Sequence, residues 1–85
     1  MEEQHEMYKQ FARRLLGEIN VNKDKRFNMA CEVDKKTGAV VCVAKEYLKD
    51  NVHKEAIYIK DKSGVLASLG DPQLVKKMIK EFNLE

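Results

Sequence analysis

A hairpin in the first half of the chain places the strongest limit on the fold. Apolar side chains alternate with others over residues 27–33, which is the period of a strand with one buried face. The segment from Asp34 to Gly38 then has the composition of a four-residue loop built on a type I turn. Residues 39–44 are continuously apolar, which is typical of a central strand. The sequence therefore predicts an antiparallel pair whose second strand lies inside a sheet.

The loop length also predicts which residues face each other in this hairpin. If Ala39 pairs with Asp34, the residue numbers of each facing pair sum to 73, and Cys31 lies opposite Cys42. Their Cα atoms would be about 4.5 Å apart at a non-hydrogen-bonded position, which is close enough for a redox-sensitive disulfide. We nevertheless expect two buried free thiols, because secreted scaffolds of this size normally carry more cysteines.

Both ends of the chain have the apolar spacing of amphipathic helices. Residues 7–19 carry apolar side chains three and four positions apart, which places them on one helix face. Residues 72–82 carry a second stripe of this kind. Asp71 can cap the start of that helix, and Pro72 suits its first position. The sequence thus predicts one helix before the strands and one after them.

The middle of the chain supplies the rest of the predicted sheet. We expect a second hairpin over residues 56–69, and either a short third helix near residues 45–53 or an irregular connection there. The prediction is one α+β domain over residues 1–85: a four-stranded, mainly antiparallel sheet of two hairpins, with the N- and C-terminal helices packed on one face. The pattern leaves the order of the strands in the sheet open.

Composition and length exclude several classes of protein. With 85 residues, 44% apolar and 35% charged, the chain is typical of one globular domain. No apolar run approaches the roughly 18 residues of a membrane-spanning helix, so we expect no membrane partner. The polar N-terminus lacks the features of a signal peptide. Together with the expected free thiols, this predicts a cytoplasmic protein.

Catalytic and cofactor motifs are missing from the sequence. Ser63 and Ser68 lack the context of a nucleophile, and the four glycines are isolated, so they do not form a phosphate-binding loop. His5 and His53 do not have the spacing of zinc ligands. We therefore expect a protein without a cofactor and do not predict an enzyme.

Two other binding functions remain as alternatives. Tyr58, near Lys45 and Lys60, could stack on the bases of RNA, although the net charge of the chain is only +2. The strand ends away from the two turns carry acidic side chains that a meander would bring to one edge, where their oxygens could hold Ca²⁺ or Mg²⁺. This candidate metal site consists of Asp24, Glu46, Asp50, Glu55 and Asp71.

The favoured function is a non-catalytic interaction module that binds a protein partner or a second copy of itself through one sheet face. We assume that both helices cover one face of the sheet, and that the second hairpin pairs residues whose numbers sum to 125. The face without helices then keeps exposed apolar side chains. The predicted partner-binding patch consists of Val41, Val43, Tyr58 and Leu69. A homodimer would bury it most simply. The alternative is that one helix crosses to this face and leaves no exposed patch.

Overall fold

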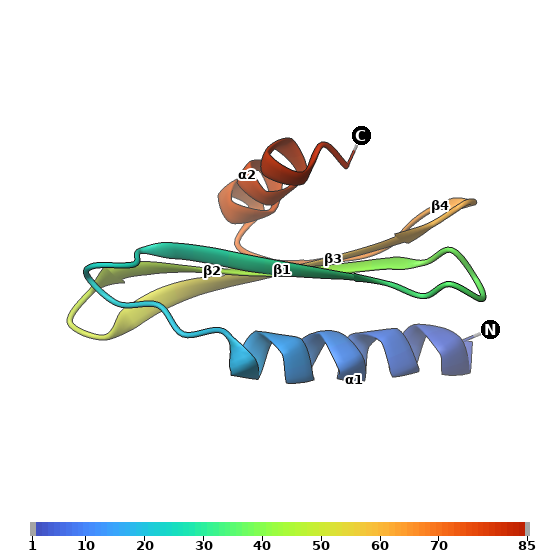
Figure 1. Ribbon diagram of the computed structural model, residues 1–85, viewed down its shortest axis with the longest axis horizontal. Helices are drawn as coiled ribbons and strands as arrows, with labels where there is room; N and C mark the ends of the chain where they lie inside the picture. Colours follow the sequence, from blue (N-terminus) through green and yellow to red (C-terminus); the bar gives the residue numbers. More distant parts are fainter. Residues whose placement is uncertain (1, 85) are drawn as a thin grey trace.

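Two helices lie on opposite faces of a four-stranded antiparallel sheet, as Figure 1 shows. The computed structural model describes residues 2–84, with side chains from His5 onward. The sheet order is β1-β2-β3-β4, so each strand pairs with the next one in the chain. The predicted α+β class with a terminal helix at each end is confirmed. In chain order the elements are α1 (Glu2–Glu18), β1 (Phe27–Val33), β2 (Val40–Lys49), β3 (Val52–Asp61), β4 (Gly64–Gly70) and α2 (Pro72–Phe82).

The placement of both helices on one face was wrong. α1 packs on β2 and β3 from one side, and α2 packs mainly on β2, β3 and β4 from the other. The physical reason is that the central strands are apolar on both faces, and both faces must then be covered. The structure instead has the alternative arrangement, in which one helix crosses to the second face of the sheet.

The sheet therefore separates two apolar cores. The core under α1 is aliphatic, and the core under α2 also contains sulfur-bearing side chains and an aromatic ring. The first core consists of Ala12, Leu16, Ile19, Val41, Val43, Ile57 and Ile59. The second consists of Cys42, Ala44, Ala56, Tyr58, Leu74, Val75 and Met78. Because neighbouring residues of a strand point to opposite faces, β2 supplies both cores in turn.

A third hairpin, and not a helix, occupies the region near residues 45–53. β2 continues to Lys49 and β3 begins at Val52. Asp50 and Asn51 connect the two strands, with φ angles of 52° and 64°. Two consecutive left-handed residues make the turn whose twist matches that of a two-stranded hairpin, and Asp and Asn tolerate this conformation better than most residues.

The register of the first hairpin is as predicted, and that of the last hairpin shifts. Cys31 faces Cys42, and the Asp34 N–H donates to the Ala39 carbonyl at 2.8 Å. In the β3–β4 hairpin, the sum of 125 holds near the turn, but a bulge next to Ile59 changes it to 126 further along. A one-residue shift moves every later side chain of β4 to the opposite face.

The start of α2 is fixed by the predicted cap. The Leu74 N–H donates to Asp71 Oδ2 at 3.0 Å, and Pro72 occupies the first turn. Gly70 precedes this cap with a φ of +95°, and an added Cβ there would overlap the carbonyl oxygen of Glu55. The end of β4 therefore requires a glycine, and α2 begins directly after it.

Candidate interaction site

The patch predicted on one sheet face does not exist as an exposed surface. Val41 and Val43 are 3% and 0% exposed in the first core, and Tyr58 is buried in the second. Only Leu69 is exposed, on the α1 side of β4. These four side chains therefore lie on two different faces. The prediction was wrong because each face carries its own helix and because the bulge in β4 reverses its later side chains.

The carboxylates of the candidate metal site do not converge. Glu46 Oε2 is 3.0 Å from Lys77 Nζ of α2, whereas Glu55 pairs with Lys45 on the α1 side of the sheet, at 3.8 Å. Asp71 caps α2 and lies 3.7 Å from the Lys54 amine. The other two predicted ligands, Asp24 and Asp50, are exposed. Over residues 5–84, whose side chains the structure describes, no three His, Cys, Asp or Glu side chains form a group that could hold a metal ion.

The residues proposed for RNA binding are engaged in the fold. Tyr58, the aromatic side chain expected to stack on bases, packs under α2. Lys45 Nζ donates to the carbonyl oxygen of Ile19 just after α1, at 3.0 Å, and Lys60 Nζ donates to the carbonyl of Leu84. Both amines hold chain segments that follow a helix and the Tyr58 ring is buried, so these three described side chains do not form an exposed basic stacking platform.

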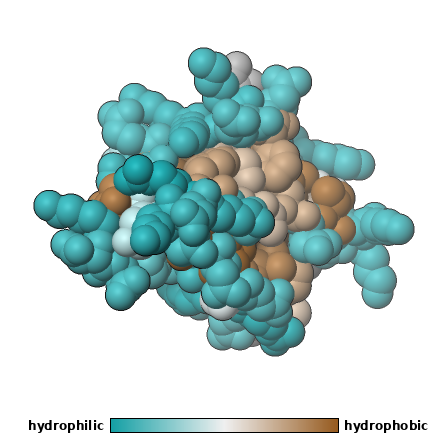
Figure 2. Space-filling view, turned by 60° about the vertical axis from the view of Figure 1, so that its left-hand side comes forward, coloured by the Kyte–Doolittle hydropathy of each residue, from teal (hydrophilic) through white to brown (hydrophobic). Residues whose placement is uncertain are grey.

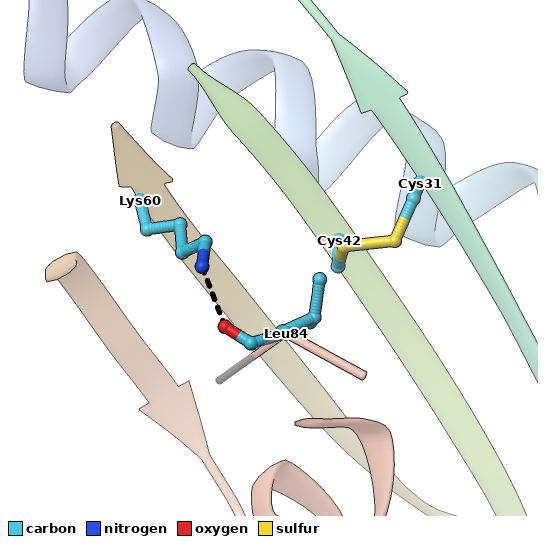
Figure 3. The surroundings of a disulfide bond; sticks show 4 residues. All are labelled: Cys31, Cys42, Lys60 and Leu84. Carbon is cyan, nitrogen blue, oxygen red and sulfur yellow. Dashed lines mark hydrogen bonds between the residues drawn. A yellow bond between two sulfur atoms is a disulfide. The ribbon is translucent and has the colours of Figure 1, made fainter. Parts of the chain in front are cut away.

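The two cysteines form a disulfide between β1 and β2, drawn in Figure 3. Cys31 and Cys42 face each other with their Cα atoms 4.2 Å apart, and Cys42 is fully buried. The expectation of free thiols was wrong, whereas the predicted register was right. That expectation rested on the number of cysteines, but a non-hydrogen-bonded antiparallel pair already brings two sulfur atoms within bonding reach.

The outer side of β1 is an open edge of the sheet. β1 pairs with β2 in an uninterrupted register, and no strand formed by residues 2–84 lies on its other side. The helices pack mainly on β2, β3 and β4, and the five residues from Phe27 to Cys31 carry no charge. Natural edge strands are commonly protected by charges, prolines, bulges or a covering helix. β1 shows little of this protection.

The backbone groups that face this edge can be identified from the ladder. Its end pairs are hydrogen-bonded: Asp34 N–H donates to Ala39, and Tyr47 N–H donates to Arg26. Such pairs alternate with non-hydrogen-bonded ones along an antiparallel ladder. The odd-numbered residues of β1 therefore direct their N–H and C=O groups outward. In agreement, the Met29 N–H is not used by β2 and donates to Asn28 Oδ1 at 3.0 Å.

Apolar side chains flank the open edge on both faces. On the α1 side, Met7 and Phe11 are 67% and 37% exposed, although they belong to the predicted apolar stripe of the helix. On the α2 side, Val33 is 58% exposed, and the rest of the row is only half-buried. Figure 2 shows that apolar side chains also reach the surface between hydrophilic ones. The half-buried row consists of Phe27, Met29 and Cys31.

Two of the pockets on the α1 side of the sheet are lined by residues of α1 itself. The one next to β1 has a volume of about 330 Å³, with apolar and aromatic walls and two carboxylates; it is lined by Met7, Tyr8, Phe11, Glu32, Val33, Asp34 and Val41. The other, of about 440 Å³, lies between α1 and the β3–β4 pair and is lined by Arg13, Leu16, Gly17, Glu55, Ala56, Ile57, Leu69 and Gly70. Leu69 is the only residue of the predicted patch that lines this second pocket.

Comparisons of the chain with protein-family models, with curated proteins and with solved structures find no match. Among the described residues, neither helix has the length and apolar character needed to cross a membrane.

Proposed function

We propose that this protein is a non-catalytic interaction module and that its binding site is the open edge of β1. A strand of another polypeptide would extend the sheet there, with main-chain hydrogen bonds providing affinity. The observation that carries the proposal is that β1 is a regular, largely uncharged edge strand whose outward backbone groups are not paired with another strand. This replaces the sheet face as the interaction surface.

The side chains around β1 would provide specificity. An added strand places alternate side chains on the two faces of the sheet. On one face they would meet the pocket beside Phe11, whose rim carries Glu32 and Asp34 and favours a basic side chain. On the other face they would meet the apolar row that includes Met29. The preferred strand is therefore apolar on one face and carries a cation on the other.

A displayed library of random 12-residue peptides tests this function without knowledge of the natural partner. Selected peptides should shift the amide NMR signals of Phe27, Cys31 and Val33 and slow the hydrogen exchange of these amides. Val33→Lys should abolish binding, because a charge on an edge strand opposes strand addition. Val65→Lys is the matched control, because Val65 lies on the other edge and is 57% exposed, against 58% for Val33. Peptides that bind only elsewhere, or that bind Val33→Lys equally well, would contradict the proposal.

The cytoplasmic location stays a prediction with its own test. It rested in part on free thiols, and the disulfide removes that support, because stable disulfides are typical of oxidising compartments. Alkylation of the protein inside intact cells, followed by mass analysis, measures the fraction of the pair that is oxidised there. A mostly reduced pair would support the cytoplasm, and a mostly oxidised pair would contradict it.

A further inference from the structure

We propose that the strand added at the edge of β1 is β1 of a second copy of this chain. This inference rests on the proposed function, because it names the partner of the same edge. Two antiparallel copies of β1, related by a two-fold axis perpendicular to the sheet, would join two four-stranded sheets into one of eight strands. Each α1 would then lie on one face of the joint sheet and each α2 on the other.

The backbone limits the registers in which two copies of β1 can pair. Residues that exchange hydrogen bonds across the new seam must be the outward ones, at positions 27, 29, 31 and 33. If facing residue numbers sum to 60, all four find partners within the strand: Phe27 faces Val33, and Met29 faces Cys31. Registers in which facing residue numbers sum to 58 or 62 leave one end of each strand without a facing residue in the other copy. The sum of 60 therefore gives the longest ladder.

The same register gives complementary charges on the α1 face. Arg26 lies opposite Asp34 of the second copy, and the two-fold axis repeats this pair at the other end. Ala30 faces itself on the axis, where two small side chains meet without a clash. Glu32 faces Asn28, so the one carboxylate inside β1 does not meet its own copy. Like charges directly opposite would destabilise the pair, and this register avoids them from Arg26 to Asp34.

The pocket beside β1 fits the Arg26 side chain of the second copy. Its walls include the aromatic rings of Tyr8 and Phe11, and its rim carries the carboxylates of Glu32 and Asp34. A guanidinium group binds both kinds of surface, by cation–π contact and by charge-assisted hydrogen bonds. In the single chain, Arg26 Nη2 donates to the Leu48 carbonyl at 2.9 Å in an exposed position. On dimerisation it would exchange this bond for the carboxylates.

The apolar row on the α2 face supplies the remaining contact. Phe27, Met29 and Cys31 already border the second core, and Val33 extends the row into solvent. In the proposed register the two rows lie side by side across the seam. Burial of these side chains would join the two α2-side cores and add an apolar contribution to the main-chain hydrogen bonds.

The first experiment measures the mass of the full chain by sedimentation from micromolar to near millimolar concentration. We expect a reversible monomer–dimer equilibrium. Asn28→Lys should tighten it about tenfold, because each new lysine faces Glu32 of the second copy, and Asn28→Glu should weaken it about tenfold. Both variants lose the Asn28–Met29 hydrogen bond, so they control for each other. Within one chain Asn28 pairs with Lys45, so the effects on monomer folding should run the opposite way.

A covalent trap checks the register independently of these affinities. Ala30→Cys places a thiol on the axis at a non-hydrogen-bonded pair, so mild oxidation should give a covalent dimer linked at position 30. Glu32→Cys should not crosslink to itself. A wild type that stays monomeric at every concentration would overturn the second-copy proposal, as would equal dimerisation by the two Asn28 variants. If selected peptides still bind β1 in the monomeric protein, the proposed function stands while this inference fails.

Discussion

The two edge strands of the sheet have the same length and few charges but different surroundings. β1 and β4 are both seven residues long, β1 has one charged residue and β4 has none, and each exposes one valine to nearly the same extent. β4 nevertheless has a bulge in its pairing, a glycine at each end and α2 on one of its faces. β1 is regular and lies outside the main helix contacts. The charge content of an edge strand therefore does not decide whether the strand is regular or whether a helix packs on it.

The two edges are also held to the sheet in different ways. β4 passes directly into α2 through Gly70, so its end is fixed by the helix that follows. β1 is joined to β2 by the disulfide between Cys31 and Cys42. A covalent crosslink keeps a strand in register without covering it. The disulfide thus ties β1 to the sheet and leaves its outer edge uncovered.

Gly70→Ala should have the largest effect and should act at the β4 edge. An L-residue at this positive φ costs about 1–2 kcal/mol, and overlap of the new Cβ with the Glu55 carbonyl adds about 1–3 kcal/mol. Gly17→Ala is the control, because an added Cβ there meets nothing within 4 Å, and it should stabilise α1 by about 0.5–1 kcal/mol. Urea unfolding measures both variants. Equal stabilities would show that the end of β4 is not fixed in this way.

Removal of the disulfide should have the next largest effect and should act at the β1 edge. The crosslink joins residues 11 positions apart, and the loss of a loop of this size reduces the free energy of unfolding by about 3 kcal/mol. We expect the double variant Cys31→Ala, Cys42→Ala to show this loss, with faster amide exchange in β1 than in β4. Two free thiols in the purified native protein, detected by mass analysis after alkylation, would contradict the disulfide.

Asp71→Ala should have a smaller effect, confined to the start of α2. It removes the side chain that accepts the Leu74 N–H, and the expected loss of stability is about 0.5–2 kcal/mol. The partly exposed ion pair with Lys54, at 3.7 Å, adds little to this. Asp71→Asn should recover most of the loss, because an amide oxygen also caps a helix. A rise in melting temperature for Asp71→Ala would contradict the capping role.

Acid should have the smallest effect and should weaken the turns beside both edges. The Lys36 N–H lowers the pKa of Asp34 below its ordinary value of 3.8, and the Ser63 hydroxyl lowers that of Asp61. A carboxylate whose pKa is lower in the folded state stabilises the fold above the unfolded-state pKa, and this contribution is lost as the pH falls through the folded-state value. Unfolding measured across pH 3.8 should therefore show less acid dependence in Asp34→Asn and Asp61→Asn. An unchanged dependence in both variants would contradict these assignments.

Local sequence signals predicted much of the fold. The loop from Asp34 to Gly38 fixed the register that places Cys31 opposite Cys42, and Asp71 correctly marked the start of α2. The connection near residues 45–53 was missed because its apolar residues have no clear period. The signal that was present is the Asp50–Asn51 pair, since these residue types accept the left-handed turn of a tight hairpin.

The candidate site could not be predicted from the same signals. A bulge next to Ile59 shifts the pairing of β4 with β3 by one residue, and no residue type in that segment predicts the bulge. The placement of the helices on opposite faces could have been predicted, because the continuously apolar residues 39–44 indicate a strand that is covered on both faces. The open edge followed only from the strand order and the helix positions, which are properties of the whole fold. The local sequence feature that accompanies the open edge is the lack of charged residues from Phe27 to Cys31.

Amide hydrogen exchange of the wild-type chain in dilute and in concentrated solution shows directly whether a second copy binds at the edge of β1. We expect the outward amides of Phe27, Cys31 and Val33 to exchange rapidly in the dilute sample and to slow down in the concentrated one. The amides of β4 should exchange at the same rate in both samples. Rapid exchange of the three β1 amides at both concentrations, or slowing confined to β4, would contradict the assignment of β1 as the edge where a second copy binds.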